Sequence, residues 1–394
     1  MTGRTDHDLA SGARADGSAA TDFVRKRRDR AAAVVSDGLA ARNASAFVHV
    51  GNDRDPGIRY ASPTPPSGVT AVAYDGVDGE WLVRSAADEA TDHPAARLAA
   101  ALADRGREGT VLTPPRIPHD AALYLEGAGL EPASTDVLER ARATKTPGER
   151  AQIGAAQRAA SAGVRRAASV LADATVVDGR LAVTERDSDG DASVSESAFL
   201  TRARLRTVVD EAIVGAGSFP AGNTAVDPDA SADSAEPLRP GEPIVLAAAP
   251  RGPAGYYGGL VRTLVVDGDG GRERRVHVGV TQSFRSARSM LTAGPESVTA
   301  VEADLEAEVR SFGFGDGDAI ETDVAGVGLE PRERPLEGGE AVGPGTVVRL
   351  DVAARVADDR WIRIADVLAV NGEGERPDWL ASPSHSLPPA AVLE

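Results

Sequence analysis

The chain has 394 residues, 42% of them apolar, and a formal net charge of −17 at pH 7. No stretch approaches the roughly 18 uninterrupted apolar residues of a membrane helix. Cysteine is absent, which excludes disulfides, cysteine nucleophiles, iron–sulfur clusters and thiolate zinc sites. Because the first 22 residues lack the apolar core of a secretory signal, we expect a cytoplasmic protein without a membrane partner.

The charged residues are mostly carboxylates and arginines. Sixty Asp and Glu stand against 43 Lys and Arg, and Lys26 and Lys145 are the only lysines. Such a surface is typical of proteins from salt-loving archaea, in which molar salt screens the self-repulsion. An acidic protein from a GC-rich bacterium, with Arg replacing Lys through codon bias, is the alternative. Because phosphate binding needs a basic face, the composition argues against a nucleic-acid partner.

The first half of the chain predicts a mixed α/β domain. Residues 1–22 are small and polar without periodicity, which predicts a disordered tail. The domain itself is expected over residues 23–140. Its predicted elements are helices over 25–39, 94–104 and 121–128, strands over 46–50 and 110–113, and a hairpin of strands over 69–74 and 80–83.

The second half predicts a larger domain over residues 141–372. Thr146-Pro-Gly-Glu149 is a capping box that begins a long helix ending near Asp173. The last residues, 373–394, are rich in Pro and Ser and predict a loose tail. The other predicted elements are a polar loop over 180–197, helices over 196–209, 273–291 and 297–312, and strands over 212–215, 243–247, 261–266, 347–354 and 361–370.

A series of motifs follows in a fixed order along the second half. They are Arg142-x-x-Lys145-Thr-x-x-Glu149, Leu238–Leu246, Gly255-Tyr256, Arg262-Thr263, Ala293-Gly294, Gly326–Pro335, Gly345–Asp351 and Ile362–Val367. In this order they resemble the creatinase, prolidase and Xaa-Pro aminopeptidase superfamily, whose motifs include "D-x-T-R-T", "H-G-x-G-L-x-x-H-E-x-P", "G-M-v-v-t-x-E-P" and "v-R-i-E-D". Asp55–Tyr60 and Val72–Gly76 resemble its N-terminal domain more weakly.

The resemblance implies an α+β fold of the pita-bread type, preceded by a smaller α/β domain. Peptidases of this superfamily hold two divalent metals through Asp, Asp, His, Glu and Glu, and the metals acidify a bridging water that attacks the peptide bond. The alignment puts these ligand positions at Ala248, Gly259, Ala325, Asp351 and Ala365. Four of the five carry no donor side chain, and Asp351 alone does not hold two hard cations.

Three interpretations of function follow from the resemblance. The first is a pseudoenzyme without cofactor that binds a peptide or small molecule, or pairs as a homodimer. The second is a metal-free, creatinase-like hydrolase that uses pocket groups such as Asp351 and Glu333 on an unknown substrate. The histidine that creatinase uses has no counterpart, since none lies between His119 and His277. The third is an active Xaa-Pro metallopeptidase, using Mn or Co, whose ligands are misaligned. The candidate pocket residues are Tyr256, Arg262, Arg332, Glu333, Arg363 and Asp366.

Among these pocket residues the arginines have two interpretations. Arg332 stands where the family has a histidine beside the metal site. In the first interpretation, structural ion pairs form among Arg332, Arg363 and Glu333. In the second, which assigns them a function, the same residues form a pocket that binds an anion.

Overall fold

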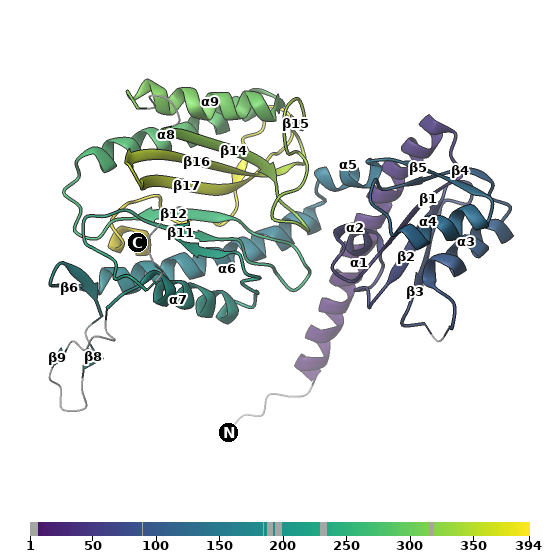
Figure 1. Cartoon of the computed structure of the whole chain (residues 1–394), viewed down its shortest axis with the longest axis horizontal. Coiled ribbons are helices and arrows are strands. Elements are labelled where there is room, and N and C mark those ends of the chain that lie inside the picture. The colour runs from purple at the N-terminus through teal and green to yellow at the C-terminus, as the bar shows by residue number, and fades with distance from the viewer. Residues whose placement is uncertain are drawn as a thin grey trace. The chain divides into compact units, whose positions relative to one another are not determined.

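A computed structural model of the chain describes residues 7–88, 90–183, 185–186, 192–193, 199–228, 235–314 and 319–394. The chain divides into two compact units, Met1–Glu149 and Arg150–Glu394, which Figure 1 shows in order along the chain. The division falls at the predicted capping box rather than at residue 140. Thr146 N–H donates to Glu149 Oε2 at 2.8 Å, and Glu149 N–H donates to Thr146 Oγ1 at 3.3 Å.

The first unit is a mixed sheet with helices packed on it. The sheet has the order β3-β2-β1-β4-β5, in which β1 pairs parallel with β4, and β4 parallel with β5. Val48, Val50, Leu98 and Leu125 belong to its core. The strands are β1 (Ala46–Gly51), β2 (Thr70–Asp75), β3 (Glu80–Ser85), β4 (Gly109–Thr113) and β5 (Leu130–Ser134), and the helices are α1 (His7–Arg42), α2 (Pro56–Ala61), α3 (Pro94–Asp104), α4 (His119–Gly127) and α5 (Val137–Ala143).

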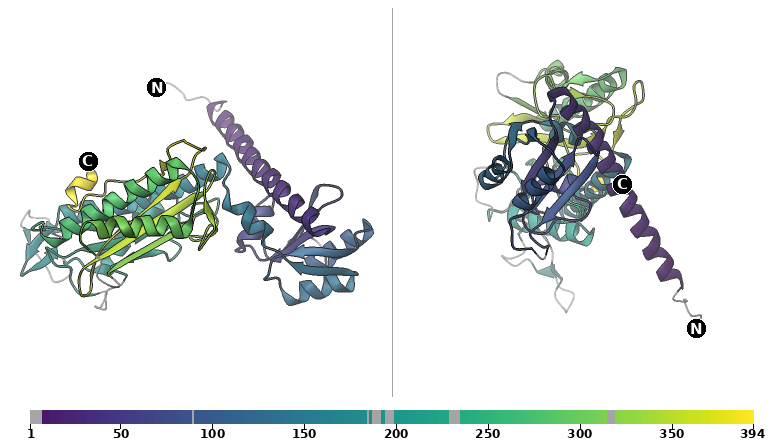
Figure 2. Two further views of the ribbon diagram at one scale, coloured as in Figure 1. Left: turned by 90° about the horizontal axis from the view of Figure 1, so that it is seen from above. Right: turned by 90° about the vertical axis from the view of Figure 1, so that its right-hand side faces the viewer.

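The N-terminal helix α1 is longer than the sequence predicts. It begins at His7, so that most of the expected disordered tail is helical, and residues 1–6 lie outside the described residues. Figure 2 shows α1 extending beyond the sheet of its unit. Asp22 pairs with Arg25 and Lys26 one turn on. Extending an anchored helix costs less than nucleating one, which explains helix in so polar a segment.

The second unit is a curved antiparallel sheet covered on one face by helices. Its strand order is β10-β11-β12-β17-β16-β14, with β18 paired to β17. The strands of this sheet are β10 (Thr224–Val226), β11 (Ile244–Ala248), β12 (Leu260–Leu264), β14 (Ile320–Gly326), β16 (Val347–Ala357), β17 (Arg360–Ala369) and β18 (Asp378–Trp379). Short strands outside it are β6 (Thr175–Val177), β7 (Arg180–Ala182), β8 (Glu185–Arg186), β9 (Ala192–Ser193), β13 (Glu296–Ser297) and β15 (Ala341–Val342).

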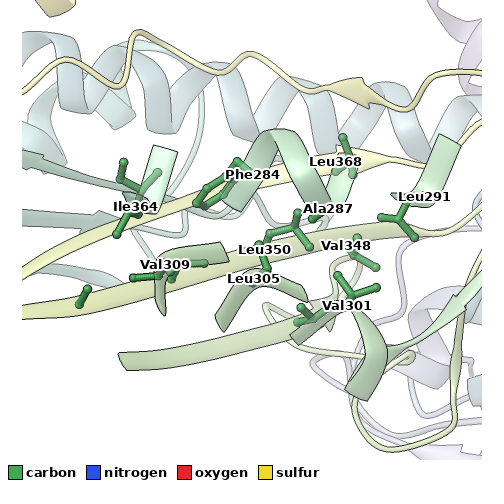
Figure 3. Close-up of a cluster of buried hydrophobic side chains, with 14 of the residues drawn as sticks. Phe284, Ala287, Leu291, Val301, Leu305, Val309, Val348, Leu350, Ile364 and Leu368 are labelled. Carbon is green, nitrogen blue, oxygen red and sulfur yellow. The ribbon is translucent and has the colours of Figure 1, made fainter. Parts of the chain in front are cut away.

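Two apolar clusters join the helices to this sheet. Helices α8 (Arg272–Ala293) and α9 (Val298–Ser311) pack on β14, β16 and β17 through a cluster that includes Phe284, Leu305 and Leu350, drawn in Figure 3. Helices α6 (Pro147–Ala172) and α7 (Arg202–Gly215) pack on β11 and β12 through Val164, Leu246 and their neighbours. Strand alternation directs every second side chain away from the helices, which leaves the opposite face for the site.

Several predicted elements differ from the structure. The strand predicted over 212–215 is the end of α7, because the packing of Ile213 in the cluster under this helix overrides the β propensity of the segment. The predicted polar loop over 180–197 contains β7, β8 and β9, and the rest of it lies outside the described residues. Strands β10 and β14 were not predicted. Among the described helices, none combines the length and apolar character needed to cross a membrane.

The C-terminal segment is the largest difference. Residues 373–394, predicted to be loose, contribute β18 and the short helix α10 (Ala390–Leu393). Val392 is fully buried in the α6–α7 cluster, and Val265 N–H donates to Leu387 O at 2.9 Å. Proline and serine in this segment therefore specify an extended strap that docks by hydrogen bonds from its neighbours, rather than disorder.

Candidate functional site

Strand register decides which predicted residues reach the open face of the sheet. Ala247, Val261, Ala365, Asp351 and Asp323 are successive cross-strand partners from β11 through β12, β17 and β16 to β14. Side chains opposite one another across paired strands lie on one face, so these five form a row. Val261 and Ala365 are buried together with Val245, and Ala247 packs against them, which makes one half of the row apolar and the other acidic.

Ala248, the predicted first ligand position, lies on the other face. It belongs to the apolar cluster under α6 and α7, with Leu246 and Leu260, whereas Ala247 belongs to the cluster of the open face. The alignment is therefore one residue out of register at this strand, and a one-residue shift reverses the face of a side chain. Neither alanine supplies a donor.

Gly259 and Ala325 lie beside the row, with Arg349 next to them. Ala325 and Val367 are both cross-strand partners of Arg349. A Cβ built on Gly259 would lie 2.9 Å from Arg349 Cδ, so the arginine stem fills the space that a side chain at position 259 needs. Gln157 of α6 holds this backbone, because its amide accepts from Gly259 N–H at 2.8 Å and donates to Gly259 O at 3.2 Å.

Arginines and aspartates form a continuous network across the open face. Arg363 binds Asp351 with two hydrogen bonds, Nε to Oδ1 at 2.8 Å and Nη2 to Oδ2 at 3.0 Å. Arg349 Nη2 lies 3.3 Å from Asp351 Oδ2 and 3.2 Å from Asp323 Oδ2. Arg332 Nη1 lies 2.8 Å from Asp323 Oδ1. Asp351 is 3% exposed, and buried carboxylates of this kind are stable only when paired.

A cavity of about 350 Å³ opens beside this network. Arg332 and Arg349 line one side of it, and Ala247 and Val261 line its apolar part; Asn223, Ala248, Ala249, Leu260, Glu330 and Pro331 complete the lining. Arg349 Nε is buried there without a hydrogen-bond partner. The cavity is large enough for a small molecule or the side chains of a short peptide, within the lower range of ligand pockets.

The donor set of the open face does not fit a pair of divalent metals. Among the described residues, no three His, Asp or Glu side chains are grouped closely enough to hold a metal ion. Both oxygens of Asp351 and of Asp323 are bound to guanidinium groups. Methyl groups at 325 and 365 cannot replace oxygen or nitrogen ligands, and Arg349 adds a positive charge where cations would sit.

Two of the predicted pocket residues, Arg262 and Asp366, lie on the helix-covered face and are fully buried. Arg262 Nη2 donates to Asp366 Oδ1 at 2.8 Å, and its guanidinium also donates to Ser382 Oγ, Pro383 O and Ser384 O. His385 Nε2 lies 2.5 Å from Asp366 Oδ2. Burial opposes ionisation, but the charge of Arg262 and the His385 hydrogen bond outweigh it and lower the pKa of Asp366. This pair fastens the C-terminal strap; it does not line the cavity.

Tyr256 and Glu333 are also buried, and they shape the neighbouring loops. Tyr256 O accepts from Gly252 N–H at 2.8 Å, and Glu333 N–H donates to Gly326 O at 2.8 Å. A Cβ on Gly328 would lie 2.0 Å from Glu333 Oε1, which explains the glycine of that motif. Of the predicted pocket residues, Arg332 lines the cavity and Arg363 joins the network; Tyr256, Glu333, Arg262 and Asp366 do not line it.

Most of the cavity lining lies outside the set of residues predicted from the sequence, and Asn223, Ala247 and Arg349 are examples; Asp323 of the network is another. Arg349 stands at the "t" of the motif "G-M-v-v-t-x-E-P". A charged residue at this position differs from the family pattern, and this difference could have identified Arg349 from the sequence. Asp323 precedes Ala325 by two residues, the period that puts both on one face of a strand. Asn223 lies just before an unpredicted strand, in the segment over 222–228 where the resemblance to creatinase would place a histidine.

Solved structures with this architecture are numerous. The prolidase from Pyrococcus horikoshii OT3 matches with a TM-score of 0.68 and 15% identity, over 91% of this chain and 99% of that one. The X-Pro aminopeptidase from Thermotoga maritima MSB8 matches with 0.70 and 13%, over 87% and 97%. The N-terminal domain of FACT complex subunit SPT16 from Cicer arietinum matches with 0.66 and 13%, over 93% and 98%.

Comparison by sequence identifies no relative of this chain. No protein-family model matches the chain, and no curated protein matches it significantly. The chain thus has the pita-bread fold of prolidases and Xaa-Pro aminopeptidases, with its preceding α/β domain, as the motifs predicted. At these identities the likeness establishes the fold alone.

Proposed function

We propose that this protein is a non-catalytic member of the pita-bread fold, which binds a peptide or small molecule in the open-face cavity without a metal. The observation that carries the proposal is Arg349. Its stem fills the space beside Gly259, and its guanidinium bridges Asp351 and Asp323. A cation fixed by two carboxylates substitutes electrostatically for a metal ion, but it cannot coordinate and acidify a water molecule.

The proposal also fits the position of Asp351, which is engaged by an arginine and does not line the cavity. Asp351, the one carboxylate at a predicted ligand position, accepts two hydrogen bonds from Arg363. A carboxylate whose two oxygens both accept from one guanidinium is directed at that arginine rather than at a substrate in the cavity. Binding groups remain: apolar surface at Ala247 and Val261, and donors on Arg332 and Asn223.

A metal-free hydrolase using histidine is less well supported. His277 and His385 are the only histidines of the second unit, and both lie with the strap on the helix-covered face. His277 Nε2 lies 2.5 Å from His385 O, and burial lowers the pKa of His277. The same placement weakens the interpretation as a metallopeptidase with misaligned ligands, because that site also needs a histidine.

The proposal predicts that the purified protein contains no stoichiometric Mn, Co or Zn and does not hydrolyse Ala-Pro or Gly-Pro when these metals are supplied. The reason is that the carboxylates of the open face are already bound to arginines and do not offer the ligands that these metals need. Elemental analysis and a dipeptide hydrolysis assay across the size-exclusion peak measure both properties. A turnover near one per second that follows the protein peak and is abolished by a chelator would contradict the proposal.

Ligand binding is tested separately by saturation-transfer NMR with a library of short peptides and metabolites. A ligand of the cavity is expected to lose its signal in Arg332→Met, which removes a lining donor from a half-exposed position. Arg310→Met on α9 is the matched control, since Arg310 pairs with Glu306 on the helical surface. Two results would refute the proposal that the cavity binds a ligand: no compound of the library binds the parent, or the compounds that bind lose equal signal in both variants.

A further inference from the structure

A second cavity, of about 480 Å³, lies on the outer side of α8, on the face of the unit opposite the open face. Its lining contains three arginines and two hydroxyl residues and no carboxylate. Arg285, Arg288, Ser289 and Thr292 occupy one side of the helix, at the i, i+3, i+4 and i+7 spacing that aligns side chains. Arg376 faces them from the connection between β17 and β18, and Ala293 completes the lining.

The other side of the same helix explains why this stripe points outward. Phe284, Ala287 and Leu291 are buried in the core against β16 and β17, as Figure 3 shows. Residues 285, 288, 289 and 292 follow these core positions by one or two residues and must therefore turn to the outer surface of the helix. The placement of the arginines is fixed by the same packing that fixes the fold.

Arg288 is held in position before any ligand arrives. Its Nε donates to Pro377 O at 3.0 Å, and its guanidinium carbon lies 5.9 Å from the centre of the Trp379 ring. Trp379 in turn packs against Phe284 with a ring separation of 5.9 Å. These contacts leave Nη1 and Nη2 as the donors available to a ligand. A guanidinium fixed on a carbonyl and a ring loses little entropy when it binds an anion.

The like charges around the cavity oppose one another. Burial, and then the charge of Arg376, lower the pKa of Arg288, and Asp378 offsets this only in part. The nearby carboxylates are engaged in the connecting loop: Asp378 Oδ2 accepts from Asn371 at 2.9 Å, and Glu375 Oε2 accepts from Gly372 N–H at 3.2 Å. In a chain of net charge −17, three arginines without a lining carboxylate form a local site that a bound anion would stabilise.

We infer that Arg285, Arg288 and Arg376 form a binding site for a phosphate group. Guanidinium groups match phosphate oxygens in pairs of parallel hydrogen bonds, and Ser289 adds a hydroxyl donor at the same surface. The cavity exceeds the size of a phosphate ion, so we assign the site to a phosphomonoester whose organic part lies beside Thr292 and Ala293. This site is independent of the open-face cavity and of the function proposed for it.

The test is calorimetric titration of the full chain at low ionic strength with phenyl phosphate and with inorganic phosphate. We expect saturable 1:1 binding of phenyl phosphate, weakened at least tenfold in Arg376→Gln and in Arg285→Gln. Both residues are exposed, so these variants should fold. Arg310→Gln on α9, which removes the same charge elsewhere on the surface, should bind as the parent does.

Three results would overturn the inference. They are the absence of saturable binding to the parent, an equal loss in Arg310→Gln, and unchanged affinity in both cavity variants. Inorganic phosphate distinguishes the source of the group: tighter binding of phenyl phosphate supports the phosphomonoester, whereas equal or tighter binding of the free ion would refute that part of the assignment.

Discussion

Asp366→Asn is expected to lower the free energy of unfolding of the second unit by about 3–5 kcal/mol, because it leaves the buried guanidinium of Arg262 without its counter-charge. Arg262 and Asp366 are both 0% exposed, so water cannot replace the lost partner. For a unit of this size, such a loss corresponds to a fall in melting temperature of roughly 10 °C. Denaturant titration followed by circular dichroism measures it, with exposed Asp358→Asn as the control.

The stability contributed by the Arg262–Asp366 pair depends on pH, because the pKa of Asp366 is lowered in the folded protein. A carboxyl whose pKa is lower in the folded protein stabilises the fold above its unfolded pKa. That contribution to stability is lost as the pH falls through the pKa that the carboxyl has in the folded protein. The parent should therefore lose stability at acid pH more steeply than Asp366→Asn does. Parallel pH profiles for the two proteins would contradict this assignment.

A double-mutant cycle separates the pair from general damage to the core. Arg262→Met alone should also be strongly destabilising, since it leaves the buried carboxylate of Asp366 with the His385 imidazole but without a guanidinium. Arg262→Met with Asp366→Leu should be much less destabilised than the sum of the single variants, because no uncompensated charge remains. Additive losses would show that the two residues are not coupled.

The motif series and the apolar periodicity predicted the architecture of the second unit, because both report local pattern. Helices α6, α8 and α9 and strands β16 and β17 lie close to their predicted ranges. The elements that were missed depend on distant partners. Strand β14 forms by pairing with β16, a partner that its own sequence does not reveal. The C-terminal strap accepts hydrogen bonds from Arg262, which lies more than 100 residues earlier in the chain.

The site was harder to predict than the fold, for a physical reason. Aligning motifs locates positions along the chain, but the chemistry depends on which face each side chain occupies and on what fills the space between them. Asp366 directly follows Ala365, and Arg262 lies three residues after Gly259, yet both face the helices. Arg349, two residues before Asp351, faces the cavity. Successive side chains of a strand point to opposite faces. Once the face of one residue is known, this alternation separates the residues that face the helices from those that face the cavity.

Rebuilding the metal site tests this assignment of faces. We expect that Ala247→Asp, Gly259→Asp, Ala325→His, Arg349→Thr, Asp351→Glu and Ala365→Glu, made together, create a protein that binds Mn²⁺, whereas the parent binds none. Five of these positions lie on one face of β11, β14, β16 and β17, and Gly259 lies beside Arg349 just before β12. The set supplies carboxylate and imidazole ligands. Titration calorimetry and the loss of the free Mn²⁺ electron paramagnetic resonance signal measure binding.

Two matched variants make the result specific. Restoring Arg349 in this set should abolish Mn²⁺ binding, because its stem competes for space with the carboxylate introduced at position 259 and its charge repels the ion. Moving the first aspartate from position 247 to position 248 should also abolish binding, because that side chain points under α6 and α7. Equal binding by all three proteins would show that the face assignment is wrong.

A smaller experiment covers the case in which the sixfold variant does not fold. Gly259→Asp alone should destabilise the protein by about 1–3 kcal/mol, the usual cost of overpacking, since its Cβ would lie 2.9 Å from Arg349 Cδ. Arg349 cannot easily move aside, because Asp323 and Asp351 hold its guanidinium. Arg349→Thr in the same chain should recover most of this loss. If stability falls further instead, the arginine does not occupy the former ligand space, and the main argument for a metal-free site fails.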